Sequence, residues 1–358
     1  MMTRISRGIQ PIIWAMVLFG MAAPGASAKS FPWRVYAEKP DDWYKSGEGA
    51  RIAENVLSNQ SQQGDWPKNI DTSEKPYDGD RSRLVGTFDN GATVGEIRFV
   101  AKAYVVTGQT RYRDAFLKGL DHVLAAQYPN GGWPQTFPPG KSYPRHITLN
   151  DNTMVNLLEL VRDVARSDSF GFVDRPRRSA CERAFDVGID CIIKCQVKAG
   201  GRPAVWCAQH DEKTLEPRGA RTYELPSLSG SESAGVLLLL MSLEDPTADA
   251  IRAVHAGARW FEASRLTGIR QVMVDGNKVI VQDRNAPPLW ARFYEIDTNR
   301  PFFCGRDGVK KYDMAEIEAE RRNGYAWYGT WGNSVAARYA RWKEKWKDGA
   351  NAARRTGD

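Results

Sequence analysis

A phrase built on glutamine, glycine and tryptophan occurs three times along the 358-residue chain, and this repeat restricts the possible folds most strongly. The first copy is QSQQGDWP at residues 60–67, and the second is QYPNGGWP at residues 127–134. A degenerate third copy runs from Gln196 to Trp206. Successive tryptophans are 67 and 73 residues apart. That interval exceeds a standard solenoid unit and fits a pair of helices joined by a long loop.

Apolar residues at helical spacing fill the intervals between the copies. Residues 234–243 are apolar on all sides, as expected for a buried inner helix. We therefore predict a mainly all-α fold, a partial (α/α)3 toroid with long loops and a few short β-strands. The long loops precede the inner helices and should gather at one end. Beyond residue 266 we expect two β runs within 272–281, and helices at 314–321 and 333–347.

The N-terminus has the layout of a secretory signal peptide. Arg4 and Arg7 precede an apolar run at residues 12–21, and Ala-Ser-Ala ends at residue 28. The apolar run is about half the roughly 20 residues that span a bilayer. We predict a signal peptide at 1–28, a single catalytic domain at 29–348 and a basic, disordered tail at 349–358. The mature chain should be a soluble monomer, secreted or periplasmic, with no membrane partner.

Charge and cysteine content narrow the function classes. The formal net charge is +7, and removal of the signal peptide with its two arginines leaves +5. A positive field suits an anionic partner. The sequence has no helix-turn-helix or zinc pattern, so an anionic polysaccharide is favoured over nucleic acid. The five cysteines include no C-x-x-C pair and are interpreted as small core residues.

Two acidic residues precede predicted inner helices. Asp89 is followed by Asn90, and Asp151 lies between Asn150 and Asn152. An aspartate in this position commonly caps a helix. Two of them at equivalent places in the repeat, flanked by amides, instead indicate oxygen ligands for calcium.

Two further clusters could carry chemistry. Arg292, Tyr294 and Arg306 lie in a segment rich in arginine and aromatic residues. Arginine suits bidentate recognition of a carboxylate, and the alternative is ordinary Arg–Glu pairing. His210 stands beside Asp211 and Glu212, which suggests a metal or acid–base role, although a lone histidine is more often structural.

Taken together, these phrases closely resemble polysaccharide lyase family ten, the α/α-toroid pectate lyases. The matching strings are GDWP (64–67), FDNGAT (88–93), YPNGGWPQ (128–135), HITLND (146–151), WCAQHDE (206–212), LPSLSGSE (225–232) and residues 287–311. They extend over nearly the whole predicted mature chain.

The resemblance implies calcium-dependent β-elimination (anti) on α-1,4-linked polygalacturonate, giving 4,5-unsaturated oligogalacturonates. It implies calcium at Asp89 and Asp151, Arg221 as the base, and arginines that bind the substrate carboxylate. Those arginines fall on Arg292 and Arg306. We also expect substrate contacts from Asn90, His210 and Tyr294.

Three other interpretations stay open at this point. Asp89 and Asp151 could be the acid and base of an inverting glycoside hydrolase on an α/α toroid. The chain could be a non-catalytic pectin-binding protein. Arg221 could pair with Glu224 or a substrate carboxylate instead of acting as a base. Only a lyase releases an unsaturated product. The absorbance of that product therefore distinguishes a lyase from a hydrolase and from a pectin-binding protein.

Overall fold

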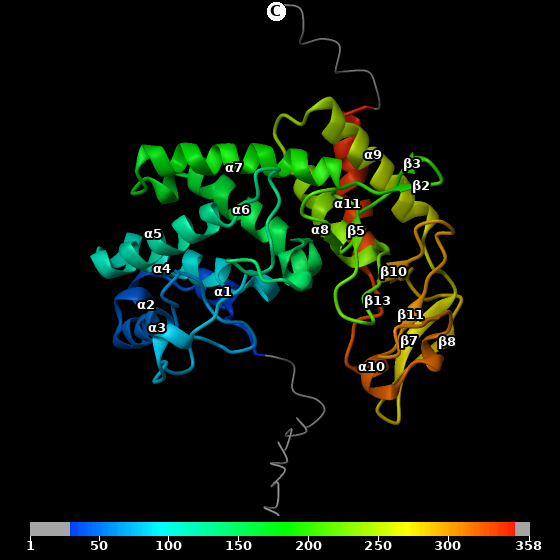
Figure 1. Ribbon diagram of the computed structural model, residues 1–358, viewed down its shortest axis with the longest axis horizontal. Helices are drawn as coiled ribbons and strands as arrows, with labels where there is room; N and C mark the ends of the chain where they lie inside the picture. Colours follow the sequence, from blue (N-terminus) through cyan, green and yellow to red (C-terminus); the bar gives the residue numbers. More distant parts are fainter. Residues whose placement is uncertain (1–28, 348–358) are drawn as a thin grey trace, which may run out of the picture.

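The computed structural model describes residues 29–347, and two facing rows of helices form most of it (Figure 1). The outer row contains α3 (Gly47–Ser58), α5 (Thr110–Ala125), α7 (Arg175–Lys194) and α9 (Ala248–Ala263). The inner row contains α4 (Val94–Thr107), α6 (Thr153–Arg166), α8 (Gly230–Leu240) and α11 (Trp331–Lys345). The mainly α-helical class predicted from the sequence is confirmed.

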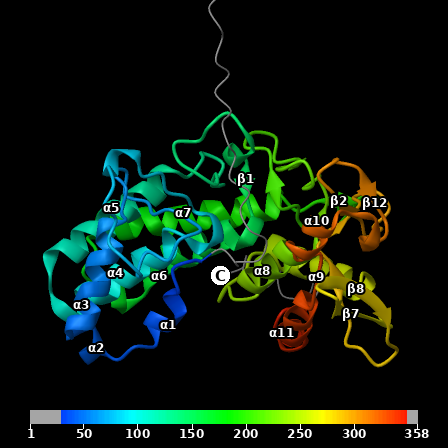
Figure 2. The same ribbon diagram turned by 90° about the horizontal axis from the view of Figure 1, so that it is seen from below.

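The helices pack as three α-hairpins, α4–α5, α6–α7 and α8–α9. Their inner helices contact one another in the order α4, α6, α8, α11, and α5 contacts α7, which contacts α9. Three pairs were predicted, but each inner helix packs on the outer helix that follows it. The long loops before the inner helices rise along one edge, uppermost in Figure 2.

The repeated glutamine ties neighbouring outer helices together. Gln60 donates from Nε2 to the carbonyl of Ala115 in α5 at 2.9 Å. Gln127 and Gln196 repeat this bond to Ala184 and Ala253, at 2.8 and 3.0 Å. Each amide also donates to its own turn, at Gly64, Gly131 and Ala204, at 3.0 Å in all three. The third, degenerate copy is thus a structural repeat.

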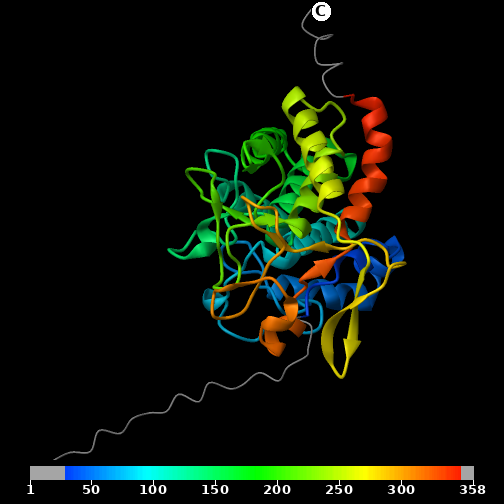
Figure 3. The same cartoon turned by 90° about the vertical axis from the view of Figure 1, so that its right-hand side faces the viewer.

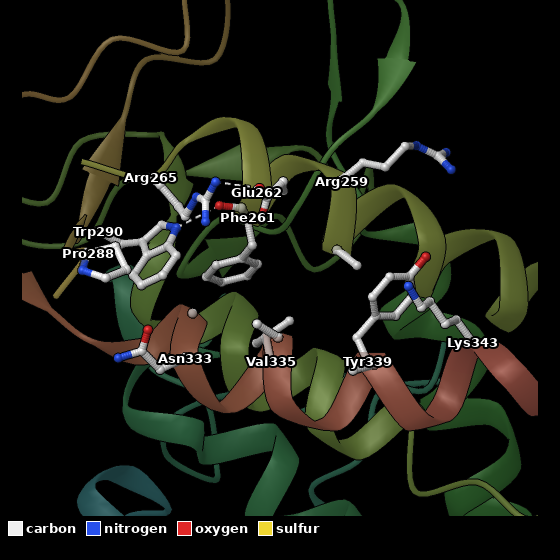
Figure 4. Close-up of a pocket in the computed structure, with 14 residues that line it drawn as sticks. Arg259, Phe261, Glu262, Arg265, Pro288, Trp290, Asn333, Val335, Tyr339 and Lys343 are labelled. Atoms are coloured by element: carbon white, nitrogen blue, oxygen red, sulfur yellow. Dashed lines mark hydrogen bonds and ion pairs between the residues drawn. The ribbon is translucent and has the colours of Figure 1, made fainter. Parts of the chain in front are cut away.

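The repeated tryptophan closes each outer helix. The indole nitrogens of Trp66, Trp133 and Trp206 donate to the carbonyls of Val56, Val123 and Ile192 near the ends of α3, α5 and α7, at 2.7–2.9 Å. Trp290 makes the same bond to Phe261 in α9 at 2.8 Å, drawn in Figure 4. Trp290 therefore marks a fourth turn of the repeat, which the sequence analysis did not identify.

A glycine in each outer helix allows close approach to its inner partner. Gly119, Gly188 and Gly257 are spaced 69 residues apart. A Cβ atom on them would lie 2.8, 2.5 and 2.7 Å from side-chain atoms of Ile97, Leu158 and Leu237. All five cysteines are buried and unpaired, as the core interpretation predicted.

Short elements complete the described chain. The helices are α1 (Trp33–Ala37), α2 (Asp41–Lys45) and α10 (Ala319–Asn323), with 3-10 turns η1 (Arg81–Arg83), η2 (Asp89–Gly91), η3 (Tyr143–Arg145), η4 (Asn150–Asn152), η5 (Asp168–Phe170) and η6 (Met314–Glu316). The helix predicted at 314–321 is therefore divided into η6 and α10. The final predicted helix is α11, beginning two residues earlier.

Within residues 29–347, thirteen strands form small antiparallel ladders. They are β1 (Ile147–Thr148), β2 (Lys198–Ala199), β3 (Arg202–Pro203), β4 (Gln209–His210), β5 (Pro217–Arg218), β6 (Leu228–Ser229), β7 (Ile269–Val274), β8 (Asn277–Gln282), β9 (Trp290–Ala291), β10 (Phe293–Tyr294), β11 (Phe303–Cys304), β12 (Lys310–Lys311) and β13 (Tyr328–Gly329). The predicted β runs are the hairpin β7–β8, which extends away from the helices in Figure 3. Pairing of β10 with β6 holds the arginine-rich segment against the start of α8.

Among residues 29–347, no helix is both long and apolar enough to cross a membrane. The predicted signal peptide, 1–28, and the predicted disordered tail, 349–358, lie outside the described residues.

Replacing Gln127 tests the bond that joins α5 to α7. Gln127→Met keeps the side-chain length but leaves two carbonyls short of a donor, so we expect a loss of about 2 kcal/mol in the free energy of unfolding. Urea denaturation measures it. Gln282→Met, on the exposed end of β8, is the control and should change stability by less than about 0.5 kcal/mol. Equal effects of the two changes would contradict the role given to Gln127.

Candidate functional site

A charged pocket of about 120 Å³ lies where the loops before the inner helices meet. It is lined by Lys68, Asn69, Asp89, Asn90, Gln135, Tyr143, Asn150, Asp151, Gln209, Arg221 and Glu224. Four of the residues predicted from the sequence, Asp89, Asn90, Asp151 and Arg221, are thus gathered in one place. The loops of three repeats contribute to this pocket.

The two acidic turns have similar backbone conformations, but their aspartates occupy different positions in the turn. Asn90 in η2 has φ 56° and ψ 25°, and Asp151 in η4 has φ 50° and ψ 33°. Asp89 therefore corresponds to Asn150, and Asn90 corresponds to Asp151. The prediction that the two aspartates are equivalent is wrong by one residue, because spacing alone does not align these turns.

Neither aspartate caps the helix that follows. The N-cap residues of α4 and α6 are Thr93 and Asn152, and in the described part of the chain neither helix has a side-chain capping bond. Asn90 and Asp151 instead hold left-handed backbone conformations, which cost free energy for residues other than glycine. Strained turns at a charged pocket favour a functional interpretation of the two aspartates over the capping one.

The two carboxylates differ in exposure and in partners. The Asp89 side chain is 5% exposed, and Lys68 forms an ion pair with its Oδ2 atom. The Asp151 side chain is 36% exposed, and its Oδ2 accepts from Asn150 at 2.7 Å. Burial raises the pKa of Asp151 above its ordinary value, although Arg292 opposes this change. A bound cation would favour the ionised form of Asp151.

Arg292 is a buried support beneath Asp151. Its Nη2 atom donates to Asn150 at 3.2 Å, to Asp151 at 3.3 Å and to Glu232 at 2.5 Å. The Arg292 side chain is 8% exposed. Arg292, which the family resemblance assigned to the substrate carboxylate, makes these hydrogen bonds to protein oxygens at the acidic turns.

Arg221 is held in two places by one carboxylate. Its Nε donates to Glu224 Oε2 at 2.7 Å and its Nη2 to Oε1 at 2.5 Å. The hydrogen bonds to Glu224 raise the pKa of Arg221 further above its ordinary value, although burial opposes this. The pairing that the sequence left open as an alternative is therefore present, and Arg221 is protonated in this arrangement.

Arg306 lies beside the pocket rather than in its lining. It is exposed and donates to both carboxylate oxygens of Glu320, at 3.1 and 3.0 Å. Its guanidinium carbon is 5.9 Å from the centre of the Tyr223 ring, and that of Arg221 is 4.9 Å from the same ring. Tyr223 thus connects the two arginines.

His210 and Tyr294 are enclosed in the protein and do not line the pocket. His210 Nδ1 donates to the carbonyl of Leu215 at 2.9 Å, and Nε2 accepts from the Cys207 amide at 3.2 Å. The Tyr294 hydroxyl donates to Ser264 at 3.0 Å and accepts from the Ala291 amide at 2.9 Å. Both side chains are almost completely buried, so the structure supports structural roles for them.

The acidic neighbours of His210 form a separate cluster with His146. One potential ligand atom from each of His146, Asp211 and Glu212 lies within 4.8 Å of the others. Arg218 donates to Asp211 at 3.0 Å, and Glu212 contacts His146 at 2.9 Å and Arg145 at 3.2 Å. These carboxylates already have cationic partners, so the first pocket is the stronger candidate site.

Sequence reasoning missed Lys68, Gln135 and Gln209, which line the pocket from three loops. The repeat contained a signal for them. Lys68 and Gln135 each lie two residues after the repeated tryptophan, and Gln209 lies three residues after it. A search for polar residues two or three positions after each repeated tryptophan would have included all three.

A larger groove adjoins the pocket through Asn90. It has a volume of about 630 Å³, and its lining includes Trp33, Arg34, Asn152 and Asn156. A further pocket of about 380 Å³ lies between α9 and α11, with Phe261, Trp290 and Val335 among its lining residues (Figure 4). It holds none of the predicted site residues.

The burial of His210 predicts a pH-dependent stability. Burial lowers its pKa from 6.5 to about 4, so the unfolded chain binds a proton that the folded chain excludes between these values. Stability should therefore fall as the pH falls, by about 2 kcal/mol from this residue between pH 7 and pH 5.

Unfolding free energies of wild type, His210→Asn and His146→Asn across this range test that expectation. His210→Asn should flatten the pH dependence, whereas His146→Asn, which changes a less buried ring, should retain it. If the unfolding free energy of His210→Asn varied with pH as steeply as that of wild type, His210 would not be the source of the pH dependence.

Comparisons with known proteins identify the family of the chain. A sequence model described as pectic acid lyase matches residues 60–336. A family 10 polysaccharide lyase from Cellvibrio cellulosa is 37% identical, with a TM-score of 0.77, covering 88% of this chain and 96% of that one. No curated protein matches.

A second solved structure is a mutant of family 10 polysaccharide lyase from Cellvibrio cellulosa in complex with trigalacturonic acid. It is 36% identical, with a TM-score of 0.76, and covers 89% of this chain and 100% of that one. The family match and these two structures together extend over most of the described residues. The chain therefore belongs to the pectic acid lyase family, as a family 10 polysaccharide lyase.

Proposed function

We propose that this pectate lyase is exported and cleaves polygalacturonate by calcium-dependent β-elimination. The observation that carries the proposal is the single pocket in which Asp89, Asp151 and Arg221 meet. An inverting hydrolase would need a water molecule activated between the two carboxylates. Here Lys68 and Arg292 pair with them instead, which suits binding of an anionic sugar.

The donor set of the pocket fits calcium. Asp89 and Asp151 supply carboxylate oxygens, and the lining also holds the amides of Asn90 and Asn150. Hard cations such as calcium prefer several oxygens of this kind. Calcium bound by these residues would offset the negative charge of the substrate carboxylate and make the adjoining C5 proton more acidic.

The polymer needs more room than the pocket provides. The pocket measures about 120 Å³, whereas the groove that shares Asn90 with it measures about 630 Å³. The amides of Asn152 and Asn156 and the indole of Trp33 could contact neighbouring sugars there. The trigalacturonic acid in the similar Cellvibrio structure supports a substrate of several uronate units.

The reaction removes the C5 proton and expels the C4 glycosidic oxygen on the opposite face. The electron pair of the C5–H bond becomes the new C4–C5 double bond, and the leaving oxygen takes a proton. Arg292 keeps Asp151 in place, and we assign proton abstraction to Arg221. This assignment requires Arg221 to leave Glu224 and lose a proton, because arginine is normally charged.

Export is supported by the signal-peptide layout of residues 1–28. The ring of Phe31 packs on Phe99 with centroids 5.5 Å apart, and Lys29 contacts Glu74 at 2.5 Å. Cleavage after residue 28 would thus leave the packed residues intact. We propose secretion or periplasmic residence, which the mass of the mature protein would test.

Removing Asp151 tests calcium dependence. Asp151→Asn should lower turnover about 100-fold at limiting calcium, because a ligand charge is lost while the side-chain volume is kept. Absorbance of unsaturated product from polygalacturonate, with and without chelator, measures it. Asp80→Asn, on an exposed loop, is the control and should behave as wild type. Full wild-type activity in excess chelator would refute calcium dependence.

Arg221 variants test the base. As a base, Arg221 acts only in the transition state, so Arg221→Ala and Arg221→Lys should lower kcat far more than they raise KM. Wild-type activity should rise into alkaline pH, since the neutral guanidine is scarce below it. Near-normal kcat with a raised KM in Arg221→Lys would instead identify Arg221 as a substrate-binding residue.

A further inference from the structure

Tyr325 lies between the two arginines nearest the acidic turns, although it follows α10 and is 104 residues from Arg221 in the sequence. Its hydroxyl donates to Glu224 Oε1 at 2.9 Å. The guanidinium carbon of Arg292 lies 4.7 Å from the centre of its ring. Tyr325 thus contacts both Glu224, which pairs with Arg221, and Arg292, which donates to Asp151.

The bond from Tyr325 completes the hydrogen bonding of Glu224. Oε1 of Glu224 accepts from both Arg221 and Tyr325, and Oε2 accepts from the Arg221 amide at 3.1 Å as well as from its Nε. Burial alone would raise the pKa of Glu224, but the hydrogen bonds from Arg221 and Tyr325 keep it below its ordinary value. Tyr325 therefore helps to keep Glu224 ionised and in one orientation.

The ring of Tyr325 has a separate effect on Arg292. All the side-chain hydrogen bonds of Arg292 found among residues 29–347 leave from Nη2, and its buried Nε has no partner there. The aromatic face is thus a main contact that limits rotation of the guanidinium plane. Cation–π packing of this kind is stronger where water is excluded.

We propose that Tyr325 is a positioning residue for the lyase reaction, holding Arg221 through Glu224 and Arg292 through its ring. The inference rests on the proposed function. Tyr325 does not line the pocket, so it acts through these partners and not on the substrate. It sets the spacing between the residue that takes the proton and the residue that fixes Asp151.

Two substitutions separate the two contacts. Tyr325→Phe keeps the ring beneath Arg292 and loses only the bond to Glu224, so kcat should fall about tenfold with KM within about twofold. Tyr325→Leu loses both contacts, and KM should then rise as well. Turnover is followed by the absorbance of unsaturated product on polygalacturonate.

The chain contains a matched control. Tyr312 donates to Glu295 at 2.8 Å, and Arg300 lies 3.5 Å from the centre of its ring, on the exposed surface. Tyr312→Phe removes the same kind of hydrogen bond and should leave kcat and KM unchanged. If Tyr325→Phe and Tyr312→Phe had equal kinetics while wild type still released unsaturated product, the positioning role of Tyr325 would be overturned and the proposed function would stand.

A double-mutant comparison excludes a merely structural effect. If Tyr325 acts through Glu224, Tyr325→Phe should add less than twofold to the loss in kcat that Glu224→Gln already causes. If the double mutant instead lost kcat by the product of the two single-mutant losses, the proposal would be overturned. If wild type released no unsaturated product, the proposed function would fail, and the positioning role would fail with it.

Discussion

The site depends on the side-chain amides of Gln60, Gln127 and Gln196. Each bonds the carbonyl of its own turn and a carbonyl in the next outer helix, so it fixes where one repeat stands relative to the next. A buried amide that lost either partner would leave a polar group unsatisfied, which makes this spacing hard to vary. Because the turns are held at a constant offset, the loops that follow them emerge on one edge. Asp89, Asp151 and Arg221, 62 and 70 residues apart in the sequence, can therefore meet in one pocket.

The repeat supplies the same turn twice, but the chain places a different side chain at each position in it. Asp89 lies at the buried position of η2, where η4 has Asn150, and Asp151 lies at the left-handed position, where η2 has Asn90. The result is one enclosed carboxylate next to Lys68 and one partly exposed carboxylate above Arg292. The exchange of Asp and Asn thus gives the two turns different side-chain environments, although their backbone conformations are alike.

Sequence reasoning succeeded where the repeat carried the information. The number of helix pairs, the β7–β8 hairpin, the burial of the cysteines and the meeting of Asp89, Asp151 and Arg221 all follow from periodicity, motif spacing or the family resemblance. It failed where contacts join segments outside the repeat. Nothing near Tyr325 in the sequence indicates that its hydroxyl reaches Glu224, and Glu232 gives no sign that it will bind Arg292. The HDE string at His210 was misleading because β4 turns that ring inward, while His146 from another loop approaches Glu212.

The two arginines of the site have different freedom, and this difference separates their roles. The Arg292 side chain is 8% exposed and shares one nitrogen among three protein oxygens, so moving it would leave the buried charge of Glu232 unpaired. That cost is several kcal/mol for a buried ion pair. The Arg221 side chain is 46% exposed and has one carboxylate partner, which another anion can replace at smaller cost. Arg292 is thus suited to hold Asp151 in place, and its contact with the substrate is limited by burial. Arg221 can therefore leave Glu224 at smaller cost than Arg292 can leave Glu232, and leaving it would remove the hydrogen bonds that raise the pKa of Arg221.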